Sequence, residues 1–356
     1  MRQSRVIALA LATCLAISLG SPARADDDEP PTPRITSARR AAAVLAAIGP
    51  GLVLRGVGSW IVGERRAAKR LAATAGVGLG ALLIGGIPIA ASGANPYSIE
   101  PGAPIAIAGV GAVLSTWWAD IAVAAGADRT GTARAAPPWS IELATIWLRD
   151  PFRQRGLGRL AADLELGRIG LGAAAMIDAE NVARDGELEV RTRIFGAAAT
   201  GEPIARGDRL VVRTAGLIHR DDDDRVTIAT AELEVQGRLD LVWLDDALAG
   251  TFAGVSTGIG VERASYAGVH DTNSLLLGTF RWGLYLGRRG EASVFYDHRR
   301  DSLAGGIAAG RAAGFVGSIG GNVDVKVAPR WAVRGQLQYG NAWVSTLAVR
   351  YQGRPR

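Results

Sequence analysis

The stretch Arg225–Leu244 reads RVTIATAELEVQGRLDLVWL. From Ala231 to Trp243 every second residue is small or apolar, and the residues that alternate with them from Glu232 to Asp240 are polar or charged. A period of two over such a length predicts a strand with one dry face and one charged face. The run is longer than a typical soluble strand of about 5–6 residues. It reaches the roughly 9–11 residues that a tilted strand needs to cross a bilayer.

The same alternation recurs through the second half of the chain. Leu188, Val190 and Ile194, for example, alternate with charged neighbours, and turn residues separate one alternating segment from the next. The predicted strands are Trp139–Leu148, Gly158–Gly167, Ile169–Asp178, Gly186–Gly196, Asp208–His219, Arg225–Trp243, Ala249–Arg263, Asn273–Gly287, Gly290–Arg299, Ala312–Val327, Arg330–Gly340 and Ala342–Tyr351. Long alternating strands of this kind are typical of membrane barrels. We therefore predict an antiparallel membrane β-barrel of about twelve strands over residues 139–351.

The connections between the predicted strands test this assignment. In a barrel whose chain starts on the periplasmic side, the even-numbered connections are short. The second, sixth, eighth and tenth connections are short, whereas the fourth, Ala197–Gly207, is long. The last hairpin, at Gly340–Asn341, is also shorter than the rule expects for an outer loop. Gly167–Gly170 is either a tight turn or the middle of one long strand, so ten strands and twelve strands both stay open.

The N-terminus has the pattern of an export signal. Two arginines precede the apolar stretch Val6–Gly20, and Ala23–Ala25 supplies small residues for cleavage, which predicts a signal peptide over residues 1–25. Cys14, the only cysteine, lies inside it, so the mature chain would have no thiol. The alternative is a lipoprotein signal at Leu11–Cys14. Residues 26–36 are acidic and rich in proline, and we expect them to be a disordered leader.

Residues 37–127 form a region rich in glycine and alanine that predicts a helical hairpin, with Ser37 as the cap of its first helix. Leu71–Ser92 carries no charge, nor does Ala103–Ala119. Each is long enough to be a spanning helix of about 20 residues, and Gly93–Gly102 is the predicted turn. We expect Gly76, Gly80 and Gly109 to let the two helices pack closely. Both a membrane-embedded hairpin and a hairpin buried against the second domain stay open. A linker at residues 128–138 and a tail at 352–356 complete the chain, which is of the α+β class.

Residues 139–351 resemble the outer-membrane β-barrel proteins of Gram-negative bacteria. The alternating runs and the aromatic-rich last strand Trp343–Tyr351 carry this resemblance. It implies a cell outer-membrane location, contact with membrane lipid, and folding by the barrel assembly machinery. Such barrels typically end on an aromatic residue, whereas here Gln352–Arg356 follow Tyr351. The glycine-punctuated block from Pro50 to Gly63 is similar to membrane-associated hairpins of uncharacterised exported proteins.

The charged positions of the predicted strands are the candidate functional residues. Alternation places them on the face opposite the apolar one, where they would line the lumen. The candidates are Asp163, Glu165, Glu187, Glu189, Arg191, Arg193, Arg209, Arg213, Glu232, Glu234, Arg238 and Asp240. Their signs are mixed, and opposite charges on neighbouring strands stabilise a sheet by roughly 0.2–1 kcal/mol per pair. Because open porins have about 16 strands, we predict a narrow or closed lumen.

Other chemistry has weaker support in the sequence. His219 beside Asp221–Asp224 could form a cation site, but the four aspartates lack the spacing of a known calcium loop, so we favour a solvated turn. His270 and His298 could act as bases at the rim, with partners among Ser265, Asp271, Asp297 and Ser302. The sequence contains no Gly-x-Ser-x-Gly, no His-Glu-x-x-His and no phosphate-binding loop. We therefore predict no catalytic, cofactor-binding or metal-binding residues.

The function that these patterns favour is a structural or narrow-pore role in the cell envelope without catalysis. Positive charge comes almost entirely from arginine. No basic patch interleaved with aromatics is present, and this absence argues against nucleic acid as a partner. Two alternatives remain. One is an inner-membrane protein with a periplasmic β-domain that acts as a scaffold or binding module. The other is a barrel-rim hydrolase that uses His270 or His298.

Overall fold

The computed structural model describes residues 36–93, 96–126, 137–149, 154–178, 183–196, 207–222, 225–266, 268–298, 317–340 and 342–353. The predicted signal peptide, the leader up to residue 35, most of the linker and the last three residues of the tail lie outside these ranges. The chain divides into two compact units. The helical unit combines the N-terminal helices with Asp240–Ala253 and Trp282–Gly287, and the barrel unit contains the rest of the strands.

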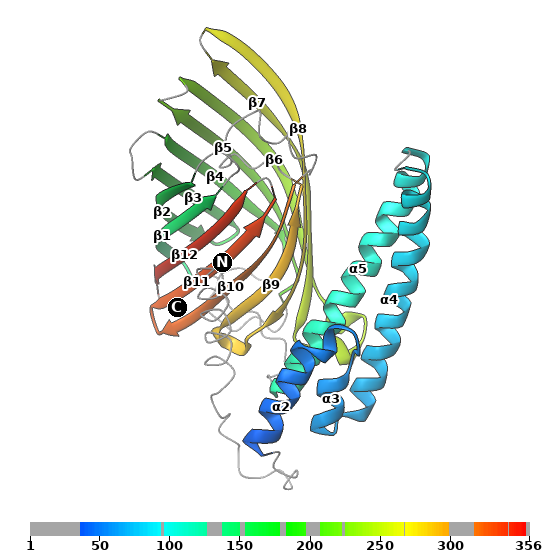
Figure 1. Cartoon of the computed structure of the whole chain (residues 1–356). Helices are drawn as coiled ribbons and strands as arrows, with labels where there is room; N and C mark the ends of the chain where they lie inside the picture. Colours follow the sequence, from blue (N-terminus) through cyan, green and yellow to red (C-terminus); the bar gives the residue numbers. More distant parts are fainter. Residues whose placement is uncertain are drawn as a thin grey trace. The chain divides into compact units, whose positions relative to one another are not determined.

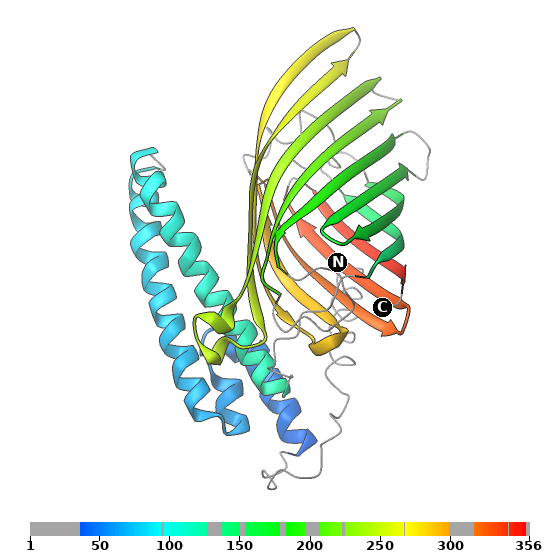
Figure 2. The same cartoon turned by 180° about the vertical axis from the view of Figure 1, so that it is seen from behind.

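The barrel is closed, antiparallel and made of twelve strands in sequence order, with β1 paired to β12 (Figure 1). The strands are β1 Trp139–Arg149, β2 Gln154–Leu166, β3 Ile169–Asp178, β4 Ala183–Phe195, β5 Arg209–Asp221, β6 Val226–Asp240, β7 Thr251–Tyr266, β8 Val269–Tyr285, β9 Gly290–Asp297, β10 Ser318–Ala328, β11 Trp331–Tyr339 and β12 Trp343–Gln352. Figure 2 shows the barrel from behind, where the long strands β4 to β8 lie side by side. The predicted fold is confirmed, and Gly167, with a φ of 65°, makes the turn that separates β2 from β3.

The strand predicted at Arg225–Trp243 ends earlier than expected. β6 stops at Asp240, and Leu241–Trp243 is a short 3-10 helix, η2, which η3 at Asp246–Leu248 follows. Leu241 continues the alternating pattern in sequence, but its side chain is buried in a cluster with Leu71, Ala119 and Leu248. Packing within the helical unit therefore overrides the local strand pattern at this end. The predicted start of the tenth strand, at Ala312, lies outside the described residues.

The two faces of the barrel wall differ in polarity. Along β1 the buried side chains are polar or small from Ser140 to Ala144 and apolar at Ile146 and Leu148. Those that alternate with them, such as Ile141 and Leu143, are exposed. In a closed barrel the buried face of a strand is the interior, so the exposed face is the outer surface. Large apolar side chains on nearly every strand lie on that outer face. A soluble periplasmic β-domain would expose such a surface to water, so the geometry argues against that alternative.

Aromatic side chains gather at both ends of the outer surface. At one end the ring of Tyr351 lies 4.9 Å from that of Trp331 and 5.6 Å from that of Trp139, between centroids. At the other end the centroids of Tyr339 and Trp343 are 4.9 Å apart. The residues from Trp343 to Tyr351 span roughly 20 Å of barrel height at ~3.3 Å per residue and a ~40° tilt. This spacing matches the aromatic girdles that flank an apolar band of about 25 Å in membrane barrels.

The described N-terminal part of the helical unit, residues 36–126, contains four helices and one short 3-10 turn. They are α2 Ser37–Ile48, η1 Pro50–Leu52, α3 Val57–Val62, α4 Arg65–Ala91 and α5 Pro96–Ala125. The cap of α2 is Thr36 rather than Ser37, because the Thr36 side chain accepts a hydrogen bond from the Arg39 amide. The predicted turn Gly93–Gly102 is also too long, since α5 already begins at Pro96. Proline suits the first position of a helix, where no amide donor is needed.

Helices α4 and α5 pack through small residues. A Cβ at Gly102 would lie 2.7 Å from the Gly85 carbonyl oxygen, and one at Gly78 would lie 2.9 Å from the Gly109 carbonyl oxygen. Only glycine allows backbones to approach this closely. The prediction for Gly109 is therefore confirmed. The predictions for Gly76 and Gly80 are wrong, because a Cβ at either position would meet open space on the other faces of α4.

Candidate functional site

Arg213 on β5 is the centre of a charged cluster inside the barrel. Its Nη2 lies 2.6 Å from Glu187 Oε1, and its Nε lies 2.6 Å from Glu189 Oε2. Its Nη1 lies 2.7 Å from Glu232 Oε2 and 3.8 Å from Glu234 Oε2. The Arg213 side chain is only 9% exposed. Four carboxylates from two neighbouring strands therefore surround one buried guanidinium.

The strand register explains why these side chains meet. The interior residue Ala215 pairs with Glu189 on β4 and with Glu232 on β6. Its small side chain leaves room for both glutamates to lean toward Arg213, which stands two residues earlier on the same face of β5. Diagonal neighbours on one face of a sheet are within reach of long side chains. The register therefore brings Glu189 and Glu232 to Arg213 as diagonal neighbours from the two adjacent strands, whereas Glu234 stands directly opposite it.

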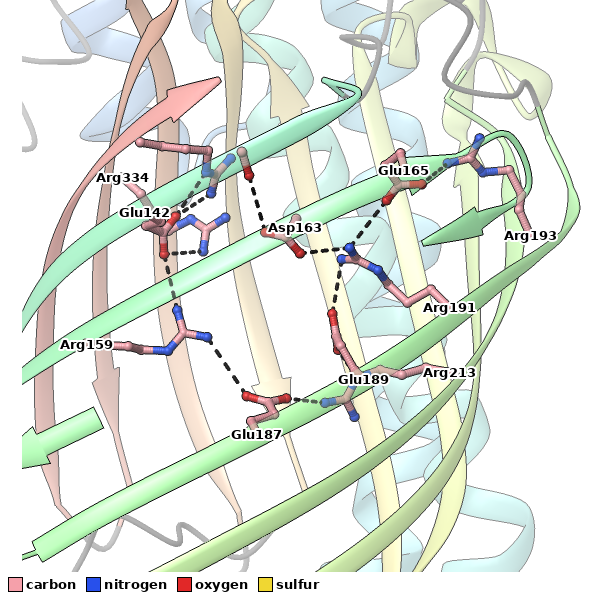
Figure 3. A network of polar contacts seen from close by, with 12 residues as sticks. Glu142, Arg159, Asp163, Glu165, Glu187, Glu189, Arg191, Arg193, Arg213 and Arg334 are labelled. Carbon is pink, nitrogen blue, oxygen red and sulfur yellow. Dashed lines mark hydrogen bonds and ion pairs between the residues drawn. The ribbon is translucent and has the colours of Figure 1, made fainter. Parts of the chain in front are cut away.

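Arg191 on β4 extends the cluster toward β2. One of its nitrogens lies 2.8 Å from Asp163 Oδ1 and 3.3 Å from Glu165 Oε1, and another lies 3.2 Å from Glu189 Oε1. Asp163 and Glu165 belong to β2, so these contacts pass over β3. The interior residues of β3 at this height are glycines, and a Cβ at Gly172 would lie 2.6 Å from Glu189 Cγ. Glycine on β3 thus leaves space for the ion pairs between β2 and β4. Figure 3 shows those of Arg191 with Asp163 and Glu165.

Glu142 on β1 is the centre of a second group of ion pairs, which includes arginines of β2, β11 and β12. Its carboxylate lies 2.6 Å from Arg350 Nη2, 3.3 Å from Arg159 Nη1 and 3.4 Å from Arg334 Nη1. Arg350 and Arg334 also contact Asp324 on β10, at 3.0 Å and 3.4 Å. Arg159 reaches Glu187 at 3.9 Å and so connects both halves. The network therefore runs without a break from β10 through β12 and β1 to β6, and Figure 3 shows its central part.

The structure brings most of the predicted residues together. Eight of the candidates contact one another or Arg213, and they are Asp163, Glu165, Glu187, Glu189, Arg191, Arg193, Glu232 and Glu234. Arg238 instead contacts Glu291 on β9, at 2.8 Å. Asp240 accepts a hydrogen bond from the Tyr285 hydroxyl within the helical unit. Arg209 is the first residue of β5 and stands opposite Arg238 on β6.

Sequence reasoning missed several members of the network. They are Glu142, Arg159, Asp324, Arg334 and Arg350. Each lies at an alternating position of a predicted strand, as Glu142 does between Ile141 and Leu143. Single charged positions such as Glu142 and Arg334 form no run of alternating charges that would mark them in the sequence. Odd and even positions of a strand point to opposite faces, so counting positions from a known interior residue could have identified these charges as interior.

A smaller polar cluster lies at the ends of β2 to β5. Arg155 contacts Asp221 at 3.4 Å and Asp178 at 4.0 Å, and His219 pairs with Asp185. The proposed cation site at His219 therefore differs from the arrangement observed, because the ring faces Asp185 on β4. Asp223 and Asp224 lie outside the described residues. Within the part of the chain that the structure describes, no group of three histidine, cysteine or acidic residues could hold a metal ion.

Among the described residues, His270 and His298 are not part of a catalytic triad. His270 Nδ1 lies 3.0 Å from Ser265 Oγ, and His298 Nδ1 lies 2.9 Å from the Tyr296 hydroxyl. In a triad one ring nitrogen faces the nucleophile and the other is held by a carboxylate. Asp271, next to His270, instead accepts a hydrogen bond from Asn273. Ser302 lies outside the described residues. The observed geometry gives this alternative no support.

A closed, even-stranded barrel with an apolar outer surface, two aromatic girdles and charged side chains inside is a membrane-spanning architecture. The fold is that of the outer-membrane β-barrels. Single-chain barrels of this type occupy bacterial outer membranes, where their outer surface contacts lipid. The predicted outer-membrane barrel is therefore confirmed at the level of fold. Its folding by the assembly machinery stays a prediction.

Several solved structures are similar to this chain. No known family profile matches the chain, and no curated protein matches it in sequence. The KdgM porin is similar in structure, with 9% identity, a TM-score of 0.39, and coverage of 60% of this chain and 98% of the porin. The outer-membrane protein Omp33 of Acinetobacter baumannii has 7% identity and a TM-score of 0.33, over 62% of this chain and 100% of Omp33. The β-domain of the Bordetella autotransporter BrkA has 16% identity and a TM-score of 0.33, over 61% of this chain and 99% of the β-domain.

Proposed function

We propose that this outer-membrane barrel has a structural or narrow-pore role, without catalysis, and that ion pairs across its own interior keep the lumen narrow. The observation that supports this is the unbroken network from Asp324 to Glu234. Each arginine in it contacts at least one carboxylate of the same chain. Side chains that neutralise one another inside the barrel leave little charge free to bind a solute.

The size of the barrel supports the same conclusion. Barrels of about eight strands are filled by side chains, and those of 16–18 strands enclose an aqueous channel. Twelve strands lie between these limits, so long side chains determine how much space stays open. Arginine and glutamate are long enough to reach across β3, as the contact between Arg191 and Glu165 demonstrates. We infer that the lumen conducts small ions weakly and with little charge selectivity.

Planar-bilayer recording tests this proposal. The double variant Arg191→Ser, Arg334→Ser removes two partly exposed arginines and leaves their carboxylates without these partners. We expect the single-channel conductance to rise by about twofold and the pore to become cation-selective, because charged rings determine selectivity. Arg220→Ser is the control, since Arg220 is exposed and its ion pair among the described residues is with Asp222. A wild-type pore with strong selectivity that the double variant retains would contradict the proposal.

A further inference from the structure

The α4–α5 hairpin has its small residues inside and its large apolar residues outside. Glycines at the contact between the helices bring the two backbones together, as described above. Large apolar side chains of α4 lie on the exposed surface, where they are between 49% and 74% exposed. They are Val77, Leu79, Leu83, Ile84 and Ile87. A hairpin folded for water does the reverse, because burying large apolar groups stabilises it most.

This arrangement is the one that lipid favours. Hydrocarbon solvates leucine and isoleucine as well as a protein core does, so helices in a bilayer associate through close backbone packing. Residues from Leu71 to Ala91 carry no charge and span about 32 Å at 1.5 Å per residue. The hydrocarbon core of a bilayer is about 30 Å thick. In the apolar window of α4 only 17% of residues are buried, compared with 50% in that of α5.

The charges at the start of α4 indicate which surface the hairpin meets. Arg65, Arg66 and Lys69 are exposed in its first two turns, beside the single acid Glu64. The Arg65 guanidinium lies 5.6 Å from the ring centroid of Trp60, which is itself exposed. Tryptophan and basic side chains together are typical of the boundary between hydrocarbon and headgroups. The positive charge of this basic collar complements anionic phospholipid.

We propose that the distal part of the α4–α5 hairpin inserts into a phospholipid bilayer, with the basic collar of Arg65, Arg66 and Lys69 on anionic headgroups. The proximal part stays within the protein, since α5 from Thr116 to Ala125 is largely buried. A second copy of the chain fits the exposed face less well. Two hairpins packed in parallel along α4 would bring two basic collars together, and like charges repel.

Site-specific fluorescence in the full-length chain tests the insertion. Ile84→Cys, in a Cys14→Ser background, carries an environment-sensitive fluorophore on the distal part of α4. In vesicles of phosphatidylcholine and phosphatidylglycerol we expect doxyl-labelled lipid to quench it and aqueous iodide to have little effect. Leu45→Cys on α2, which is 70% exposed, is the matched control and should be quenched by iodide. A heat-modifiability gel confirms that the barrel of each variant is folded.

A second variant tests the collar. Replacing Arg65, Arg66 and Lys69 by glutamine should lower the preference of the inserted state for phosphatidylglycerol vesicles by about fivefold per cation removed. Quenching of the Ile84 label by iodide to the same extent as the Leu45 label would overturn the proposal. So would protection of the Ile84 label that depends on protein concentration and ignores doxyl lipid, because that outcome indicates a second copy. A lipid preference unchanged in the glutamine variant would refute the role of the collar.

Discussion

Arg213→Ala is expected to destabilise the barrel by about 3–5 kcal/mol, the usual cost of removing one partner from a buried charge network. The reason is the set of carboxylates that the guanidinium neutralises. Glu232 and Glu234 are both buried, and the Glu234 side chain is fully inaccessible. Without Arg213 these charges would face one another and the nearby Glu187 and Glu189 across a site with little water. Unpaired buried charge is far more costly than the loss of an exposed ion pair.

Two further variants sharpen this prediction. Arg213→Lys keeps the charge, but lysine has one ammonium nitrogen where arginine has three guanidinium nitrogens in a plane, each on a different glutamate. We therefore expect an intermediate loss of stability. Arg220→Ala removes an exposed arginine on the same strand and should change the stability by no more than about 1 kcal/mol. The urea concentration at which heat modifiability is lost measures the stability of the barrel in all three variants. Equal midpoints for Arg213→Ala and Arg220→Ala would mean that the interior network does not stabilise the barrel.

Asp120→Ala is expected to destabilise the helical unit by about 3–5 kcal/mol, since each buried donor left without a partner costs about 1–3 kcal/mol. Asp120 on α5 is fully buried. It accepts hydrogen bonds from the Ser59 amide at 2.7 Å, the Ser59 hydroxyl at 2.6 Å and the Gly58 amide at 3.1 Å. These donors include the first amides of α3. Burial lowers the pKa of the nearby Arg55 guanidinium, and the Asp120 charge partly offsets that effect.

Hydrogen exchange of the amides in α3 and α5 measures this effect separately from the barrel. Asp120→Asn is the matched control, because its amide retains one acceptor oxygen and similar volume. We expect this control to lose about half as much protection as Asp120→Ala. The exchange of the β1–β6 amides should stay unchanged in both variants. Wild-type protection of α3 in Asp120→Ala would show that the helix does not depend on this carboxylate.

The sequence was sufficient to predict the strands because alternation is a local property. The bounds of β3 match the prediction at both ends, and those of most other strands differ by a few residues. β6 is the informative exception. The alternation continues to Trp243, but Leu241 packs against Leu71 and Ala119, which are far away in sequence. Contacts of that kind are invisible to a pattern read along one segment.

The charged network was predictable only in part, for the same reason. The parity of each position predicts the face on which a charge lies, and this reasoning located Glu187, Glu189 and Glu232. The partners depend on the register between strands. The contact between Asp163 and Arg191 also requires the glycines of β3 to stand between them, which only the paired strands reveal. On the hairpin the phase of the helix decided which glycines face the partner helix, and Gly76 and Gly80 fall on the other side.

A spin-label scan along β1 tests most directly whether the strands form a membrane-spanning barrel with one face toward lipid and one face inside. Cysteines introduced one at a time from residue 141 to 148, with Cys14 replaced, would carry the label in the full-length chain in lipid vesicles. We predict that accessibility to oxygen, which dissolves in lipid, peaks at Ile141, Leu143, Thr145 and Trp147 and falls at Ala144 and Ile146, with a period of two. High accessibility of the odd-numbered positions to a water-soluble nickel complex, or the loss of this period, would contradict the account.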